Sequence, residues 1–504
     1  MRFFSKQILV DQHGKATNFK LHSLEFPHMR ALHFAWFSFM VAFMSWYAIP
    51  PIVVHIAKDL DIAPVEIYDA NMVSVAITIL ARLVIGPLCE RFGPRRVMCS
   101  VLLLGAIPCG MTGLISNGTG LIVIRAIIGI LGGAFVPCQF WTTQMFAPSV
   151  VATANSLSAG WGNMGAGVTY LLMPAIYDGI AVRTGDAIAW RVTFVVPAGI
   201  CIVVAIMDYL FATDTPHGDW LVLRQQELEK NQRGSDIDDT TRNSSNSIAS
   251  IETPEQKLEK GFIVTTGTAH EVHAKGTSDD ESIADVRRSQ SIGETLVTFG
   301  KVFCKPAVLI MIIHYACSLG VELAIDNVIG EVFREHFNLD PSTAAYIGSI
   351  FGLLNLFSRL CGGLLSDALA KRFHLSGRIL AHLSLMCLEG LFLIGFSFGL
   401  STNLPSAVVL MVFFSFFVQA VCGSTFGIVP FIDPLNNGKV MGMVGAGGNI
   451  GGIIFNLMFR QFQPNFESAF LCLGCIALGA GIAGNLLLRV QDKTIWHLFD
   501  GRYA

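Results

Sequence analysis

Twelve apolar stretches, each about 20 residues or longer and so long enough to cross a bilayer as a helix, limit what this 504-residue chain can fold into. Only 14% of its residues are charged, against roughly 25% in soluble domains. This excludes a soluble enzyme, a disordered protein and a typical nucleic-acid binder. The expected spans are 31–55, 68–89, 97–116, 119–146, 150–178, 189–212, 306–332, 342–366, 378–400, 404–430, 439–460 and 466–488.

A polar gap divides these stretches into two groups of six. We therefore predict an all-α membrane protein with 12 transmembrane helices, in two six-helix halves. The gap combines low hydrophobicity with acidic runs such as Asp236–Asp239, which predicts a largely disordered linker. The expected domains are an N-terminal tail (1–30), the N-terminal half (31–212), the linker (213–305), the C-terminal half (306–488) and a C-terminal tail (489–504).

Basic residues in short loops indicate the orientation. One cluster, Arg91, Arg95 and Arg96, follows the second span, and Lys371, Arg372 and Arg378 follow the eighth. Loops rich in Lys and Arg remain in the cytoplasm. We therefore expect a multi-pass protein of the plasma membrane whose two termini and linker are cytoplasmic.

The two halves repeat each other at specific positions. In the second span, Arg82 precedes Gly86 by four residues and Glu90 by eight. The eighth span repeats this spacing with Arg359, Gly363 and Asp367. Such a repeat predicts a duplicated transporter with its substrate site between the halves.

A second repeat lies in two glycine-rich helices. Asn163 follows Gly162 in AGWGNMG (159–165), and Asn449 follows Gly448 in GAGGNIGG (445–452). Glycine lets helix backbones approach closely, which suits a small cavity. The two asparagines could supply amide donors from opposite halves; the alternative is that they bond to neighbouring helices.

Two arginines carry the predicted chemistry. Arg82 lies eight residues before Glu90, about 12 Å into the membrane, and Arg359 has the same depth by the repeat. An intramembrane arginine normally faces a cavity or a partner. Two arginines could hold an anion between them, while the alternative is a salt bridge to an acid. The candidate acids are Asp69, Glu322, Asp326 and Glu389.

Further candidates come from two other spans. In the seventh span, Glu322 and Asp326 share a helix face, and one of them could carry a proton. Alternatively, they are solvated near the outer end or paired with an arginine. In the fourth span, Gln139 and Trp141 could line the cavity, although aromatic packing is the other explanation. No clustered metal ligands or nucleophile–base motif occurs, so we expect no enzyme, metal or cofactor.

The loop after the second span is distinctive. It reads Gly86-x-x-x-Glu90-Arg91-x-Gly93-x-Arg95-Arg96 and resembles the signature loop of the major facilitator superfamily. We interpret Gly86, Glu90, Arg91 and the corresponding Asp367 as a conformational latch rather than a binding site.

Six segments resemble the nitrate/nitrite porters of that superfamily, and within them the eukaryotic high-affinity nitrate transporters. They are FVPCQFWTTQMF (135–146), ANSLSAGWGNMGAG (154–167), GVELAIDNVI (320–329), SRLCGGLLSD (358–367), CGSTFGIVPF (422–431) and GAGGNIGG (445–452).

This resemblance implies specific roles. Arg82 and Arg359 would clasp nitrate, Asn163 and Asn449 would be the signature asparagines, and Tyr315 would line the site. The chain would import nitrate and nitrite with protons by alternating access, and some relatives need a small single-span partner protein. Two alternatives stay open: a carrier of another small inorganic or organic anion, and a nitrate sensor that signals through the linker.

Overall fold

The computed structural model describes residues 3, 5–223, 292–339 and 341–498. Most of the linker between the halves lies outside these ranges. The predicted disorder of the linker, and the sensor function that depends on it, therefore concern residues outside the description. By contact, Met1–His217 and Leu296–Ala504 form one unit and Gly218–Thr295 another. The first unit contains both halves and is the one described below.

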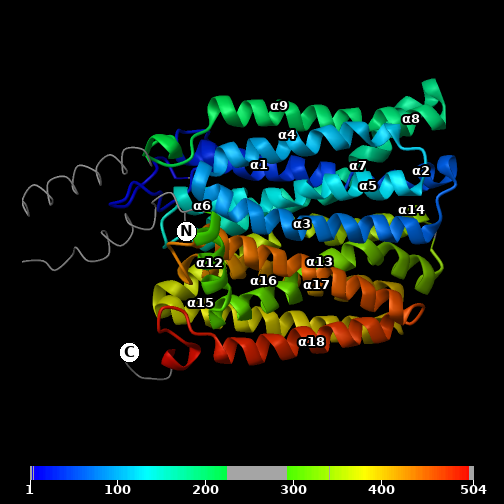
Figure 1. Ribbon diagram of the computed structural model, residues 1–504. Coiled ribbons are helices and arrows are strands. Elements are labelled where there is room, and N and C mark those ends of the chain that lie inside the picture. The colour runs from blue at the N-terminus through cyan, green and yellow to red at the C-terminus, as the bar shows by residue number, and fades with distance from the viewer. Residues whose placement is uncertain (1–2, 4, 224–291, 340, 499–504) are drawn as a thin grey trace, which may run out of the picture. The chain divides into compact units, whose positions relative to one another are not determined.

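The N-terminal half consists of helices that run side by side (Figure 1). Gly93, with φ of 86°, allows α4 to begin directly after α3 without a longer loop. The elements are α1 (His28–Trp46), η1 (Pro50–Ile52), α2 (Val53–Leu60), α3 (Pro64–Phe92), α4 (Pro94–Met111), η2 (Thr112–Leu114), α5 (Gly118–Ile128), η3 (Gly129–Ala134), α6 (Phe135–Met145), α7 (Val151–Thr184), α8 (Asp186–Thr193) and α9 (Val195–Phe211).

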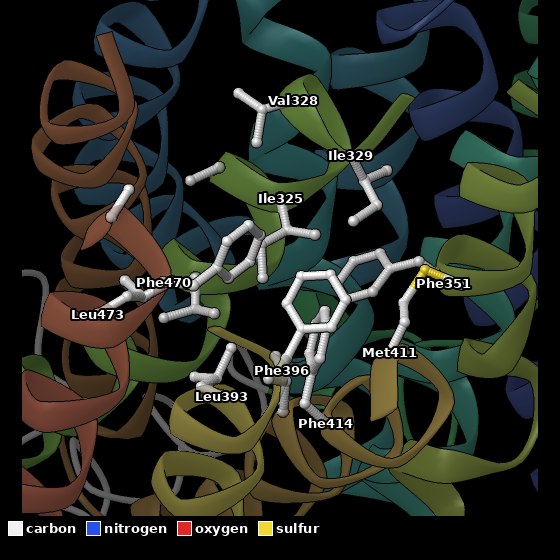
Figure 2. Packing of buried hydrophobic residues seen from close by; sticks show 14 of the residues in the cluster. Ile325, Val328, Ile329, Phe351, Leu393, Phe396, Met411, Phe414, Phe470 and Leu473 are labelled. Carbon is white, nitrogen blue, oxygen red and sulfur yellow. The ribbon is translucent and has the colours of Figure 1, made fainter. Parts of the chain in front are cut away.

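The C-terminal half repeats this pattern, and it is preceded by a helix, Ile292–Phe303, in the segment 213–305 that the sequence assigned to the linker. Its elements are α12 (Ile292–Phe303), α13 (Pro306–Phe337), α14 (Pro341–Leu353), η4 (Leu354–Leu356), α15 (Ser358–Leu400), α16 (Leu404–Ile428), η5 (Val429–Phe431), α17 (Asn437–Phe462), α18 (Phe466–Leu487) and η6 (Ile495–Leu498). Its interior is an apolar cluster in which side chains of α13, α15, α16 and α18 interdigitate (Figure 2).

The predicted spans are confirmed. Among the described residues, eleven helices are long and apolar enough to cross a membrane. One of them, Ile347–Leu400, has 54 residues, about twice the length that a bilayer needs. It contains a non-helical residue, His374, with φ of 52° and ψ of −135°. The chain turns there, so this segment makes two crossings and the total is twelve.

Two spans are broken where the sequence predicted continuous helices. The fourth span changes to a 3-10 turn, η3, and the eighth is interrupted by η4 and by Phe357. In η3, the carbonyl of Gly129 accepts a hydrogen bond from Thr78, and the carbonyl of Gly132 accepts one from Arg82. Arg359 follows the second break directly. Both breaks therefore lie beside the predicted arginines.

Both terminal segments lie at the same end of the helices, which we call the termini end (Figure 1). The backbone of Ala16 pairs with residues around Phe146, after α6, and Ser376 donates to the carbonyl of Thr494. At the opposite end, which we call the far end, Arg191 of α8 bonds to Asp59 and to the carbonyl of Gly113.

Candidate functional site

Arg82 of α3 is fully buried between the halves. Its Nε donates to the carbonyl of Gly132 (3.0 Å) and its Nη1 to the carbonyl of Gly445 in the other half (2.7 Å). Its guanidinium carbon lies 5.0 Å from the centre of the Phe135 ring. Nη2 has no hydrogen-bond partner in the described parts of the chain. Arg82 therefore has neutral partners, and its positive charge is not balanced by a salt bridge.

Arg359 of α15 is also fully buried, but it has a carboxylate partner. Its Nη2 forms a salt bridge with Oε2 of Glu322 on α13. Asn355 joins the two residues: it accepts from Nε of Arg359 (2.8 Å) and donates to Oε1 of Glu322 (2.8 Å). The salt bridge that the sequence left open thus forms at Arg359 and not at Arg82. Nη1 of Arg359 still has no hydrogen-bond partner among the residues described.

Tyr315 of α13 connects the two arginines. It is fully buried, and both guanidinium groups interact electrostatically with it. Its ring lies 6.0 Å from that of Phe135 and 5.1 Å from that of Phe426, centre to centre. Its hydroxyl interacts with the guanidinium of Arg359 but forms no hydrogen bond of good geometry with the described residues. Two guanidinium groups and one carboxylate leave one positive charge, surrounded by unused donors and aromatic walls, and this arrangement suits a small anion.

The glycine-rich segment of α17 forms another wall. Gly445 supplies the carbonyl that holds Arg82, and a Cβ on Gly448 would lie 2.9 Å from Cδ1 of Tyr315. Asn449 is one turn beyond Gly445 and so shares its helix face. The side chain of Asn449 is fully buried, and neither of its amide atoms has a partner among the described residues. The C-terminal motif thus lies against both Arg82 and Tyr315.

The N-terminal motif on α7 is placed differently. Asn163 donates to the carbonyl of Ala159 in its own helix (3.0 Å), and Gly162 packs against the ring of Phe39. It is Gly160 that approaches the second arginine: a Cβ there would lie 2.6 Å from the carbonyl oxygen of Asn355 and 3.2 Å from Cβ of Arg359. The duplicated motifs therefore have unequal contacts with the site.

Two predicted cavity residues on α6 instead connect neighbouring segments. Gln139 donates to the carbonyl of Asn155 (3.2 Å) and to Ser158 on α7 (3.3 Å). The indole of Trp141 donates to the carbonyl of Thr213, after α9 (2.7 Å). The side-chain N–H groups of both residues are thus used by these neighbours.

Towards the far end, the halves are separated by a cavity of about 430 Å³. Its lining includes polar side chains from both halves: Asn71, Arg125, Tyr170, Asn327, Asn456 and Arg460. Asp326, one turn beyond Glu322, is partly exposed and interacts electrostatically with Tyr47 and Tyr170 of the N-terminal half. The predicted pair of acids is thus divided, with Glu322 held at Arg359 and Asp326 nearer the cavity.

At the termini end, the halves are closely packed. Glu90 of α3 accepts from the side chain of Lys439 on α17 (2.5 Å) and from its backbone N–H (3.1 Å). A Cβ on Gly86 would collide with the carbonyl of Gly438. Arg91 is exposed, and its guanidinium lies over the ring of Phe92. Glu90 therefore joins the two halves directly.

Asp367 makes the corresponding contact between α15 and α7. It accepts from the backbone N–H (2.8 Å) and the hydroxyl (2.5 Å) of Thr153, and it lies 2.7 Å from Nη2 of Arg378. Arg378 also donates to the carbonyl of Pro148 in the N-terminal half. The two acids that occupy equivalent positions in the repeat therefore both connect the halves at the termini end.

The sequence did not single out several residues of these contacts. They are Asn355, Phe135 and Phe426 at the arginines, and Lys439 and Thr153 at the termini end. Asn355 precedes Arg359 by four residues, so helical spacing could have indicated it. The other four belong to distant parts of the chain, and only folding brings them to their partners.

Comparison with known proteins identifies the family. The model of the Major Facilitator Superfamily matches residues 35–455. High affinity nitrate transporter 2.5 of Arabidopsis thaliana is 34% identical over 478 residues, which cover 94% of this chain and 82% of that protein. Nitrate transporter 2.1 of Chlamydomonas reinhardtii is 32% identical over 93% of this chain and 76% of its own length. Nitrate/nitrite transporter NrtP of Nostoc punctiforme is 27% identical, with 94% of each chain covered.

A solved structure supports the same fold. The proton:xylose symporter XylE bound to 6-bromo-6-deoxy-D-glucose superposes with a TM-score of 0.61 at 13% identity, over 93% of this chain and 98% of that one. At this identity, the likeness concerns the fold alone. Taken with the relatives above, it shows that the chain belongs to the major facilitator superfamily and, within it, to the high-affinity nitrate transporters.

Proposed function

We propose that this protein is a secondary active transporter that imports nitrate, and also nitrite, with protons by alternating access. The observation that carries the proposal is the pair of buried arginines, one from each half, each with a guanidinium nitrogen that lacks a partner among the described residues. Tyr315 and Asn449 add unused polar groups to the same region. A carrier needs such a site at the interface of its halves, where movement of the halves exposes it to either side.

The chemistry of nitrate fits this arrangement. Nitrate is flat and spreads one negative charge over three oxygens, and it stays ionised near neutral pH. It therefore needs fixed cations with planar donors, which guanidinium groups provide. Nitrite has the same charge and a similar plane. We propose that Nη2 of Arg82 and Nη1 of Arg359 donate to the anion, with Tyr315 and Asn449 as further donors.

The closed termini end and the cavity at the far end represent one state of the transport cycle. The basic clusters of the sequence lie at the termini end, so we propose that this end is cytoplasmic and that the cavity opens to the outside of the plasma membrane. Binding of nitrate would neutralise the excess positive charge between the halves and so favour their closure. Glu90 and Asp367 would then release the termini end as the halves rock.

Proton coupling would act through the pair of Glu322 and Arg359. An inward-negative potential opposes the import of an anion by about 2.3 kcal/mol per charge per 100 mV, so uptake requires more than one co-transported proton. Glu322 already binds the guanidinium that nitrate needs. Protonation of Glu322 would release Arg359 to the anion, and this makes the two binding events cooperative. A small single-span partner protein would bind to this twelve-helix protein.

A voltage-clamp experiment tests the proposal. In oocytes that express the full chain, nitrate should evoke an inward current that grows as the external medium is acidified. Chlorate and nitrite should compete with nitrate, whereas carboxylates should not, which separates nitrate transport from carriage of organic anions. Uptake of labelled nitrate without any pH dependence would contradict proton coupling, and uptake that carboxylates block would contradict the substrate assignment.

Substitution of Gly448 tests the site itself. The Cβ of a Gly448→Ala variant would lie 2.6 Å from Cδ2 of Leu319 and 2.9 Å from Cδ1 of Tyr315, so the Tyr315 ring must shift. We expect nitrate uptake to fall by about tenfold, since strain of 1–3 kcal/mol is typical of overpacking. Gly479→Ala on α18, where a Cβ meets nothing within 4 Å, is the matched control. Equal uptake by both variants would exclude Tyr315 from the site.

A further inference from the structure

Glu389 of α15 lies inside the C-terminal half, away from the substrate site. Its side chain is fully buried, and neither carboxyl oxygen has a hydrogen-bond partner among the described residues. Met386 precedes it on the helix and Leu393 follows one turn later, and both belong to the apolar cluster of this half (Figure 2). An ionisable group is thus inserted into hydrocarbon surroundings.

The burial of Glu389 does not stabilise the fold. A carboxylate without a partner in an apolar interior costs several kcal/mol, so the group is a neutral acid in this conformation. Even the neutral acid forms no hydrogen bond with the described residues, and an apolar side chain would fill the same space at lower cost. An intramembrane acid of this kind indicates a function in ion or proton movement.

The groups around Glu389 leave it without a nearby cation. From α13, Cys317 and Glu322 interact electrostatically with it, and from α16, Cys422 does so. Sγ of Cys422 lies 3.6 Å from Oε2 of Glu322, so Cys422 interacts with both acids. The neighbouring Gly390 packs against Leu478 and the backbone of Gly474 on α18, and this contact adds no charge. The described cation that contacts this group of residues is Arg359, and it forms its salt bridge with Glu322.

A chain of hydrogen bonds lies nearer the termini end. His382 is two turns before Glu389 on the same face of α15, and its Nε2 is 3.1 Å from Nδ1 of His314 on α13. The other nitrogen of His314 is 3.2 Å from the carbonyl of Ala480, and Nδ1 of His382 is 2.7 Å from the hydroxyl of Ser424. Both histidines are fully buried.

This chain can hold one extra proton without losing a hydrogen bond. In the neutral form, Ser424 donates to His382, His382 to His314, and His314 to the carbonyl of Ala480. When a proton is added, Nδ1 of His314 donates to Nε2 of His382, and Nδ1 of His382 donates to the hydroxyl of Ser424. His314 still donates to the carbonyl of Ala480, and Ser424 now donates to the carbonyl of Val421, 2.9 Å away. Two protonation states with every bond satisfied are the property that a proton relay needs.

We propose that Glu389 is a proton-binding site inside the C-terminal half, and that His382 and His314 pass its proton to the termini end. This inference rests on the proton coupling proposed above. When nitrate occupies Arg359, Glu322 loses its cation and takes up a proton. When nitrate leaves, Glu322 rebinds Arg359 and passes its proton to Glu389, while Glu389 releases the proton that it held to the relay. No bond other than those to the proton is made or broken.

The depths of these groups agree with such a route. His382 is about 9 Å along α15 from Ser376, which contacts the C-terminal segment, and Glu389 is about 20 Å from it. His314 is about 12 Å along α13 from Pro306. The relay thus spans part of the distance between the acids and the termini end, within the C-terminal half and apart from the path of nitrate.

The test uses the full chain in proteoliposomes with two assays. Counterflow of labelled nitrate at equal pH requires no proton gradient, whereas accumulation under a pH gradient does. In the unaltered protein, each coupled proton should support about tenfold accumulation per pH unit. We expect Glu389→Gln to retain counterflow and to lose accumulation. The control is Glu335→Gln, an exposed acid of α13, which should behave like the unaltered protein.

Proton coupling, the site at Glu389 and the histidine relay each have a different result that would overturn them. Counterflow without accumulation in the unaltered protein would contradict proton coupling itself. Accumulation by Glu389→Gln at the unaltered level would overturn the site at Glu389 while leaving symport intact. His382→Gln should retain counterflow and lower the initial rate of pH-driven uptake by about tenfold, because glutamine cannot accept the extra proton. An unchanged rate in that variant would overturn the relay.

Discussion

An Arg82→Lys variant should take up nitrate about 10- to 100-fold more slowly than the unaltered protein at low nitrate concentrations, since a hydrogen bond to a charged group contributes about 1.5–3 kcal/mol. The guanidinium uses Nε for Gly132 and Nη1 for Gly445, and it keeps Nη2 for the anion. One ammonium group retains the charge but cannot reach two fixed carbonyls and the anion in the same plane. Initial rates of labelled uptake, normalised to the amount of protein in the membrane, give the measurement.

A second arginine serves as the control. Arg191 also donates to two backbone carbonyls, those of Gly113 and Ile115, but it lies at the far end on α8. Arg191→Lys should therefore show any general cost of losing a guanidinium without loss of affinity for nitrate. Near-normal affinity in Arg82→Lys, with normal protein levels, would contradict the role of Arg82 in binding.

Reversal of charge at the termini end should have an effect of similar size. In Glu90→Lys, two cations would meet where the carboxylate now lies 2.5 Å from Nζ of Lys439. Lys439 is buried and Glu90 is partly exposed, so loss of this ion pair costs less than the roughly 3–5 kcal/mol of a fully buried pair. A cost of a few kcal/mol still shifts a two-state equilibrium towards the state that is open at the termini end. We expect uptake from dilute nitrate to fall by tenfold or more.

The double variant Glu90→Lys with Lys439→Glu tests this explanation. It restores opposite charges across α3 and α17, so uptake should recover most of its original rate. Glu335→Lys makes the same charge change at an exposed acid of α13 and should have little effect. Failure of the exchanged pair to recover, in protein that reaches the membrane, would show that Glu90 acts through something other than Lys439.

Much of the fold follows from local features of the sequence. The spans could be located because about 20 apolar residues without charge have few alternatives to a transmembrane helix. The repeat of Arg82 and Glu90 in Arg359 and Asp367 indicated two related halves, and the relatives confirm the family. The 3-10 turns that interrupt two spans were not predicted, because η3 and η4 occur in stretches that remain apolar.

The partners of the buried groups could not be predicted in the same way. Sequence symmetry suggested that Arg82 and Arg359 are equivalent, yet only Arg359 has a carboxylate, because Glu322 reaches it from α13. Likewise, four acids were possible partners, and Glu389 remains without any partner in the described structure.

Sequence alone thus determined the number of crossings, the duplication and the presence of two arginines deep in the bilayer, since each depends on hydrophobicity or spacing along one helix. The tertiary structure decided which charges are balanced and which end is closed. Those depend on contacts between residues hundreds of positions apart, such as Glu90 with Lys439, and only the packing of whole helices brings such residues within hydrogen-bond distance.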